Sequence, residues 1–377
     1  MIYFDNSATT RIDPQVVDAM LPFLYEEFGN PSSKYYSLAT NAKDAIEEAR
    51  EIISRLLGCT PDEVVFTAGA TESNNMIIKG VIEYYGGGNP HLVISKAEHS
   101  SVLETAKYFE NKGVKVTYLD VDIFGRVNIG DFNNIISNEN KPTLVSIQWG
   151  NNELGSLNDI LYLSRQCAER NIFFHTDATQ VTGKVNMDIK ATGIHFLSCS
   201  AHKFHGPKGI GAAIIRKDSL GIRTKLTPLI HGGGQENDYR SGTHSVHNIV
   251  GFGKAAELAM DELENKRVLL SSLEKVLRDQ LLTTFGDIIY FNSDVQDKIP
   301  GIVNVQFKGI NNELLIKKIS NQFAISTGSA CSSSKPSHVL QSIGLSINEV
   351  RNSVRISLSK YNTEAEIERF VSTLSGK

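Results

Sequence analysis

Apolar residues recur with helical spacing in two segments near the start of the chain. Residues 14–28 predict an amphipathic helix, which the turn-forming sequence GNPSS at 29–33 ends. Residues 38–56 predict a second helix, because apolar side chains line one face and charged side chains fill the other. Gly58 suits the end of that helix, since glycine readily adopts the left-handed conformation found there.

From residue 63 onward, short apolar runs alternate with helical patterns. The runs predict strands at 63–66, 91–95, 114–119, 143–148, 171–176, 194–199 and 212–215. Helical patterns stand between several of them, the clearest at 76–84 and 98–111. Such alternation is typical of parallel strands joined by crossover helices. It predicts an α/β sheet whose ligand groups gather at the carboxyl ends of the strands.

The last third of the chain has a different pattern. Residues 246–282 predict one helix that is longer than usual in a globular protein, and such a helix commonly links domains. The segments after it predict a smaller α+β domain. Its expected strands are 288–291, 302–307 and 354–358, and its expected helices lie near 312–320, 337–343 and 364–374.

Polar residues follow four of the predicted parallel strands. They are His99, the run NNE at 151–153, Asp177 and Lys203. Taken singly, His99 is more often an ordinary loop histidine, and Asp177 is more often a cap. Four such positions in succession along one edge of a sheet favour a ligand-binding site.

Lys203 lies in SCSAHKFHGPKGIG, residues 198–211, between an apolar strand and a turn rich in glycine and proline. A lysine on a tight, partly buried turn loses hydration, which lowers the pKa of its amine and makes it a usable nucleophile toward an aldehyde. A surface lysine at a strand end is the alternative that this stretch alone leaves open.

A corner of small residues, TAGATESNN at 67–75, joins the predicted strand 63–66 to the helix that follows. Such a corner exposes backbone N–H groups at a helix N-terminus, where the helix dipole favours an anion such as phosphate. Thr71 could add a hydroxyl group. An ordinary N-cap without a ligand fits the same residues equally well.

Composition excludes several classes of function. The chain has 377 residues, 41% of them hydrophobic, which is enough for a large core and for two domains. Its 38 basic and 42 acidic residues are well mixed and give a net charge of −4, which argues against direct binding to nucleic acid or a membrane surface. The start, MIYFDNSATT, lacks the features of a signal peptide, and no apolar run approaches membrane-spanning length. We therefore expect a cytoplasmic protein.

The four cysteines, Cys59, Cys167, Cys199 and Cys331, stand far apart without C-x-x-C spacing, which argues against a disulfide framework and against a zinc site. Cys331 lies in STGSACSSSKP, residues 326–336, a run of small residues unlike the apolar surroundings of Cys167 and Cys199. An exposed thiol near charged groups can form the reactive thiolate, whereas a thiol in apolar packing is normally inert.

Taken together, these motifs resemble the NifS/IscS-type cysteine desulfurases, which are pyridoxal-phosphate (PLP) enzymes of fold type I in the class V aminotransferase group. The similarity runs from YFDNSATT at residues 3–10 to VRISLS at 354–359. It implies an α/β fold with a large domain, residues 13–256, built on a mostly parallel seven-stranded sheet flanked by helices. It also implies a smaller α+β domain, residues 1–12 and 257–377, which carries the cysteine loop.

The resemblance also implies a role for each motif residue around the cofactor. Lys203 would form the Schiff base with PLP and act as a base when freed. Asp177 would pair with the pyridinium nitrogen, while His99 would stack on the ring and move protons. The other contacts would come from Ala70, Thr71, Ser200 and His202 near the phosphate, Gln180 at the ring hydroxyl, and Thr243 of the neighbouring subunit of a homodimer.

The reaction that the resemblance implies converts L-cysteine to L-alanine. Asn151 and Arg355 would hold the substrate carboxylate, Arg355 through its planar fork of donors. Cys331 would take the sulfur as a persulfide and deliver it to an acceptor protein. An aminotransferase or a selenocysteine lyase would use the same Lys203 and Asp177 without depending on Cys331. A non-enzymatic scaffold with this fold is a further alternative.

Three features depart from the family pattern and bear on the acceptor. Trp149 stands where the family usually has histidine, and His244 and Ser245 follow RSGT where Leu-Pro is common. The segment from Cys331 to Pro336 is shorter than in the housekeeping members, and the chain ends about where those begin an extension that docks an iron–sulfur scaffold. These departures favour a specialised desulfurase, similar to those that serve tRNA thiolation or DNA phosphorothioation.

Overall fold

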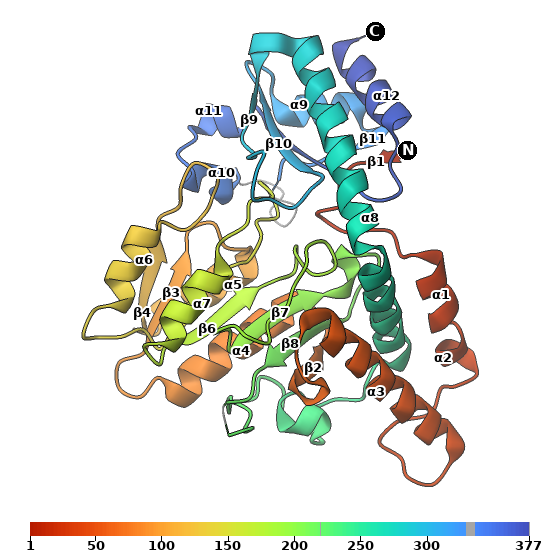
Figure 1. Ribbon diagram of the computed structural model, residues 1–377, viewed down its shortest axis with the longest axis vertical. Coiled ribbons are helices and arrows are strands. Elements are labelled where there is room, and N and C mark those ends of the chain that lie inside the picture. Colours follow the sequence, from red (N-terminus) through yellow and green to blue (C-terminus); the bar gives the residue numbers. More distant parts are fainter. Residues whose placement is uncertain (219, 329–335, 377) are drawn as a thin grey trace.

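Seven strands form the central sheet of the molecule (Figure 1), of which the computed structural model describes residues 1–218, 220–328 and 336–376. The strands lie in the order β2-β8-β7-β6-β5-β3-β4, and β8 alone runs in the opposite direction to the other six. Their bounds are β2 Val64–Thr67, β3 His91–Ser95, β4 Lys115–Leu119, β5 Leu144–Ser146, β6 Phe173–Asp177, β7 Phe196–Ser200 and β8 Gly211–Ile215. The predicted mostly parallel, seven-stranded sheet is confirmed.

Helices cover both faces of this sheet. They are α3 Ser37–Leu57, α4 Ala70–Tyr85, α5 Ser100–Glu110, α6 Ile129–Ile136, α7 Ile160–Ala168 and α8 Val246–Phe285. The helices α4 and α5 pack on one face, and α3, α6, α7 and the first half of α8 pack on the other. Successive residues of a strand therefore enter different cores: in β8, Ala212 and Ile214 face one core, whereas Ala213 and Ile215 face the other.

Two of the predicted helices have the wrong boundaries. The segment 14–28 forms two short helices, because Pro22 has no N–H to continue the first one. They are α1 Pro14–Met20 and α2 Pro22–Tyr25. The helix predicted at 76–84 already begins at Ala70, so the small residues of the preceding corner form its first turns.

The long helix α8 connects the two ends of the molecule (Figure 1). It runs for 40 residues without a break, which confirms the predicted long helix and extends it to Phe285. Its first half packs with the central sheet through residues such as Phe252 and Ala256, and its second half packs with the C-terminal sheet through Leu273, Leu277 and other residues. One helix thus contributes to two hydrophobic cores.

The C-terminal part contains a three-stranded antiparallel sheet in the order β12-β10-β9 and a two-stranded parallel sheet of β1 and β11. The strands are β1 Ile2–Tyr3, β9 Ile289–Phe291, β10 Ile302–Phe307, β11 Phe323–Ala324 and β12 Ser353–Ser357. The helices are α9 Asn312–Ile319, α10 His338–Ser342, α11 Ile347–Val350 and α12 Glu364–Ser375. The first residues of the chain therefore pair with its last third. The exact domain boundaries stay a prediction.

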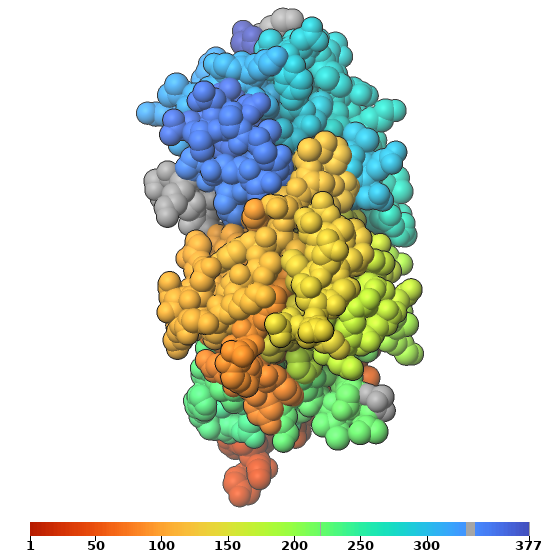
Figure 2. All heavy atoms as spheres, turned by 90° about the vertical axis from the view of Figure 1, so that its left-hand side faces the viewer, coloured from red at the N-terminus to blue at the C-terminus, as the bar shows by residue number. Residues whose placement is uncertain are grey.

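The molecule is elongated, with the C-terminal elements forming its upper end (Figure 2). In that view they rest on the helices and loops of the central α/β part, so a single body is built from both. None of the helices within the described residues has both the length and the apolar character needed to cross a membrane.

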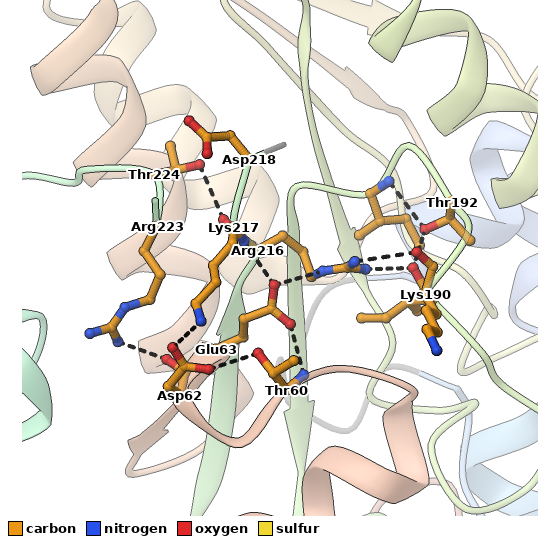
Figure 3. Close-up of polar contacts among 12 residues, drawn as sticks. Thr60, Asp62, Glu63, Lys190, Thr192, Arg216, Lys217, Asp218, Arg223 and Thr224 are labelled. Carbon is orange, nitrogen blue, oxygen red and sulfur yellow. Dashed lines mark hydrogen bonds and ion pairs between the residues drawn. The ribbon is translucent and has the colours of Figure 1, made fainter. Parts of the chain in front are cut away.

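A polar network closes the edge of the sheet where β2 begins and β8 ends (Figure 3). The buried carboxylate of Glu63 accepts hydrogen bonds from the backbone N–H of Thr60 at 2.8 Å, from Arg216 Nε at 3.0 Å and from the backbone N–H of Lys217 at 2.8 Å. Next to it, Asp62 pairs with Lys217. The turn before β2 is thereby tied to the segment that follows β8.

A second buried carboxylate, that of Glu236, ties the loop before α8 to α3 and β2. It forms a bidentate pair with Arg50 at 2.8 and 2.9 Å, and it accepts hydrogen bonds from the backbone N–H of Phe66 and from His244. Glu236 and Asn237 both have φ above +50°, a strained conformation for residues other than glycine. The ion pair holds this strained loop in place.

We predict that Glu236→Ala lowers the free energy of unfolding by about 3–5 kcal/mol, because Arg50 is then buried without its partner. Burial alone would raise the pKa of Glu236, but hydrogen bonds from Arg50 and His244 lower it from its ordinary value of 4.5 to about 2. A carboxyl group with a lowered pKa stabilises the fold above its unfolded pKa, so the difference between wild type and variant should shrink as the pH falls from 4.5 toward 2.

Thermal and chemical unfolding of both proteins across this pH range measures the difference. The matched control is Glu47→Ala, which removes the exposed partner of the same arginine and should cost less than about 1 kcal/mol. Equal losses in the two variants would contradict the prediction.

Candidate active site

A cavity of about 800 Å³ lies where the carboxyl ends of the parallel strands meet the N-terminal segment and the C-terminal sheet. Its lining includes residues that follow β2, β3, β5, β6 and β7, which is the edge that the sequence pattern indicated. Of the predicted site residues, the lining contains Ala70, Thr71, His99, Asp177, Gln180, Ser200, His202, Lys203 and Arg355. Residues from distant parts of the chain thus share one cavity.

Lys203 lies in the turn that follows β7. The strand ends at Ser200, and a single turn of 3₁₀-helix, η2 Ala201–Lys203, brings the lysine to the cavity. Its Nζ donates hydrogen bonds to the carbonyl oxygens of Ser7 at 2.6 Å and Ala8 at 2.8 Å. The N-terminal segment therefore holds the amine of Lys203 and forms part of the site.

Asp177 is the last residue of β6, and its carboxylate is buried. Oδ2 accepts a hydrogen bond of 2.7 Å from Asn74 Nδ2, and Oδ1 accepts one of 3.0 Å from the backbone N–H of Thr179. Asn74 Nδ2 also donates to Ser101 Oγ at 2.8 Å. One amide group of α4 thus contacts both the carboxylate and the hydroxyl group beside His99.

His99 is the N-cap of α5, and its ring lines the cavity. Its Nδ1 accepts a hydrogen bond of 3.2 Å from the backbone N–H of Ser101 and lies 2.8 Å from the Ser101 hydroxyl. Because a backbone N–H can only donate, the neutral ring carries its proton on Nε2. Burial lowers the pKa of His99; the charge of Asp177 opposes this effect and that of Lys203 adds to it.

The N-terminus of α4 faces the turn after β7. Gly69, which precedes the helix, has φ +149°, a conformation that side chains rarely allow. Ala70 and Thr71 follow as the first helical residues, and Ser200 lies beside Gly69. His202 completes this corner: its Nδ1 lies 3.1 Å from Thr9 Oγ1, and burial together with the neighbouring Lys203 lowers its pKa to about 4. The corner can therefore offer backbone N–H groups, hydroxyl groups and a neutral imidazole to an anion.

Arg355 comes from β12 and reaches the cavity from the C-terminal side. It is buried, with Nη2 donating to Asp5 Oδ1 at 2.7 Å and Nη1 donating to the carbonyl oxygens of Asn152 and Gly328 at 3.0 and 3.1 Å. Its Nε is buried without a hydrogen-bond partner among the described residues. This N–H is therefore an unsatisfied donor in a residue that lines the cavity.

Asn151, the other predicted substrate contact, does not belong to the lining of the cavity. Its Oδ1 accepts hydrogen bonds from the backbone N–H groups of Glu153 and Leu154, and its Nδ2 donates to the carbonyl oxygen of Ala97. These bonds shape the turn after β5 that brings Asn152 and Glu153 to the cavity. Contact between Asn151 and a substrate stays a prediction.

Two further predicted residues lie elsewhere. Thr243 is exposed and does not line this chain's cavity. Cys331 lies outside the described residues, although Gly328, just before its loop, does line the cavity. Of the sequence departures, Trp149 packs against the main hydrophobic core, and His244 contacts Glu236 through a 2.6 Å hydrogen bond.

Sequence reasoning missed several residues that organise the site. Asn74 lies in the corner of small residues, and Ser101 lies two positions after His99. Both are close to predicted site residues, but the sequence pattern assigned neither of them a role. The carbonyl group of Ser7 and the side chain of Lys184 were missed as well. Any residue can supply a backbone carbonyl group, so the contact of Ser7 could not be predicted from the sequence. Asn74 lies in the predicted anion-binding corner, and its position there could have suggested a role in the site.

Comparison with known proteins assigns the chain to a family. The family described as "Aminotransferase class-V" matches residues 2–370. The cysteine desulfurase IscS of Rickettsia typhi is 39% identical over all of this chain and 90% of its own length. A solved NifS-like protein is 35% identical with a TM-score of 0.92, over all of this chain and 98% of its own. SspA, solved in complex with cysteine, is 36% identical with a TM-score of 0.83, over 96% of this chain and all of its own.

The chain therefore belongs to the class V aminotransferase family, as the sequence motifs indicated. Its likeness extends through all three sheets and the long helix, because the alignments cover the whole chain.

We predict that the neutral His99 ring carries its proton on Nε2 and becomes charged only below the ordinary pKa of 6.5, because burial lowers its pKa and Ser101 occupies Nδ1. Nitrogen NMR of the imidazole, assigned by comparison with His99→Gln, reports both the charge and the tautomer. A His99 ring that becomes charged at or above pH 6.5 would contradict the prediction.

Proposed function

We propose that this protein is a cysteine desulfurase that uses pyridoxal phosphate to convert L-cysteine to L-alanine and transfers the sulfur to Cys331. The observation that carries the proposal is the convergence of Lys203, Asp177, His99 and Arg355 on one cavity. The full-length similarity to proteins named cysteine desulfurase supports it.

The residues of the cavity fit pyridoxal phosphate. Three of its lining residues, Ser7, Thr179 and Arg355, each have a buried polar atom that has no hydrogen-bond partner among the described residues, namely Oγ, Oγ1 and Nε, respectively. The anion corner at α4 suits the phosphate, the Lys203 amine suits the aldehyde, and the Asp177 carboxylate suits the pyridine nitrogen. When bound, this cofactor supplies an electron sink that stabilises negative charge at the substrate Cα.

The side chains around it would divide the remaining work. Asn74 orients the Asp177 carboxylate through its 2.7 Å hydrogen bond, so that the carboxylate keeps the ring nitrogen protonated. His99 presents an N–H from Nε2 at the cavity and can exchange that proton with the substrate. Lys203, once freed from the cofactor, would act as the base at Cα, and the guanidinium group of Arg355 would bind the substrate carboxylate.

Among the cysteines, Cys331 is the best candidate for the sulfur-accepting thiol. Burial raises the pKa of Cys59, Cys167 and Cys199, which keeps these thiols protonated and inert. The step would transfer one sulfur atom: the thiolate of Cys331 attacks the sulfur of the substrate, the C–S bond breaks with its electron pair going to Cβ, and Cβ takes up a proton. The remaining amino acid leaves as L-alanine, and Cys331 carries the persulfide. The overall conversion is L-cysteine plus enzyme thiol to L-alanine plus enzyme persulfide.

We further propose that the active unit is a homodimer in which Thr243 reaches the phosphate site of the second subunit. Its exposure, away from this chain's own cavity, supports that arrangement. The sulfur acceptor would be another protein, either an iron–sulfur scaffold or a protein of tRNA thiolation or DNA phosphorothioation. We expect the enzyme to act in the cytoplasm.

The proposed function is tested by Cys331→Ser in the purified, cofactor-loaded protein. Release of both alanine and sulfide from L-cysteine in the presence of a thiol reductant should fall by about a hundred-fold or more, because the group that accepts the sulfur is gone. The visible absorption of the cofactor should be retained. The matched control is Cys59→Ser, which removes an inert thiol and should keep full activity.

Alanine release that persists in Cys331→Ser would favour a selenocysteine lyase, and amino-group transfer to a keto acid would favour an aminotransferase. A colourless protein without bound cofactor would point instead to a non-enzymatic scaffold.

A further inference from the structure

Lys184 is a basic residue of the site to which neither the sequence motifs nor the proposed chemistry gives a role. It lies in the turn region after β6 and is half-buried. Its Nζ donates a hydrogen bond of 2.9 Å to Gln180 Oε1. Within the described residues, no carboxylate lies within ion-pair distance of it, which is unusual for an enclosed ammonium group.

Lys184 and Lys203 line the same small cavity of about 40 Å³, which adjoins the larger one. None of the described residues that line it is Asp or Glu. The other basic residues of this lining are His205 from the turn after β7, Lys266 and Arg267 from α8, and Lys360 from the segment after β12. Lys266 pairs with Glu262, and Lys360 pairs with Glu262 and Asp13. The positive charge of Lys184 is therefore less compensated than the charges of these two lysines.

A chain of hydrogen bonds connects Lys184 to the amine of Lys203. Gln180 Oε1 accepts from Lys184, and Gln180 Nε2 donates to the carbonyl oxygen of Ser7 at 2.9 Å. The same carbonyl oxygen accepts from Lys203 Nζ at 2.6 Å. Because an ammonium group can only donate, Lys184 also decides which end of the Gln180 amide faces Ser7.

We propose that Lys184 is a positioning residue for the lysine–cofactor site, with two effects. It fixes the Gln180 amide so that its N–H groups face the N-terminal segment and the cofactor ring. In its protonated form it also adds positive charge to the cavity that it shares with Lys203, which favours the uncharged amine that a base or nucleophile requires. This inference rests on the proposed function, since it assigns a role within that same site.

The electrostatic effect of Lys184 on Lys203 follows because two like charges repel each other equally. Burial, with the charges of Lys203 and Arg355, lowers the pKa of Lys184 to about 7. A repulsion that disfavours the charge of Lys184 disfavours the charge of Lys203 to the same extent, and the two groups titrate as a coupled pair. A lysine made nucleophilic by a second cation is a known way of activating an amine.

The test compares Lys184→Met, which removes donor and charge, with Lys184→Gln, which keeps an N–H donor but removes the charge. The visible absorption of the cofactor bound to Lys203 is followed against pH in the holoenzyme, and retention of the cofactor is measured by dilution and dialysis. Both variants should move the midpoint of the titration upward by about half a pH unit or more. Only Lys184→Met should lose cofactor faster.

The control is Lys266→Met, which removes a lysine of the same cavity that is paired with Glu262 and should leave the midpoint in place. Midpoints in both Lys184 variants that coincide with that of the wild type would overturn the inference while leaving the proposed function intact. A wild-type protein that binds no cofactor would overturn both.

Discussion

The central constraint on this molecule is that its main sheet is covered by helices on both faces. An unsatisfied polar group is costly in a strand that is buried on both sides, which favours polar side chains at strand ends or paired across the sheet. His175 in β6 shows such pairing, because its two ring nitrogens contact Ser146 and Ser198 on the neighbouring strands. The residues of the candidate site lie at one edge of the sheet, where the strand ends, α4 and the C-terminal sheet meet.

At that edge, neighbouring protein groups hold the side chains that carry charge. The amide of Asn74 contacts both Asp177 and Ser101, so the positions of the carboxylate and of the imidazole of His99 depend on one side chain. The carbonyl of Ser7 gathers Lys203 and Gln180 in the same way. Because these hydrogen bonds hold the side chains in place before a ligand binds, the reaction requires less rearrangement of the site.

The sequence predicted much of the fold because its signals are local. Buried strands read as short apolar runs, and the residues at their ends, such as His99, Asp177 and Lys203, were found by position alone. The failures have physical causes. Pro22 divides the first helix within an amphipathic pattern that continues on both sides, and small residues conceal the helical start at Ala70. The contacts of Asn151 and Asn74 depend on long-range packing, which no spacing along the chain records.

The central claim is that sulfur passes from L-cysteine to Cys331, and mass spectrometry of the protein after brief exposure to L-cysteine tests it most directly. The account predicts one additional sulfur atom on the peptide that contains Cys331, removable by a thiol reductant, with the peptides of Cys59, Cys167 and Cys199 unchanged. Alanine formed in stoichiometric amount while Cys331 stays unmodified, before any reductant is added, would contradict it.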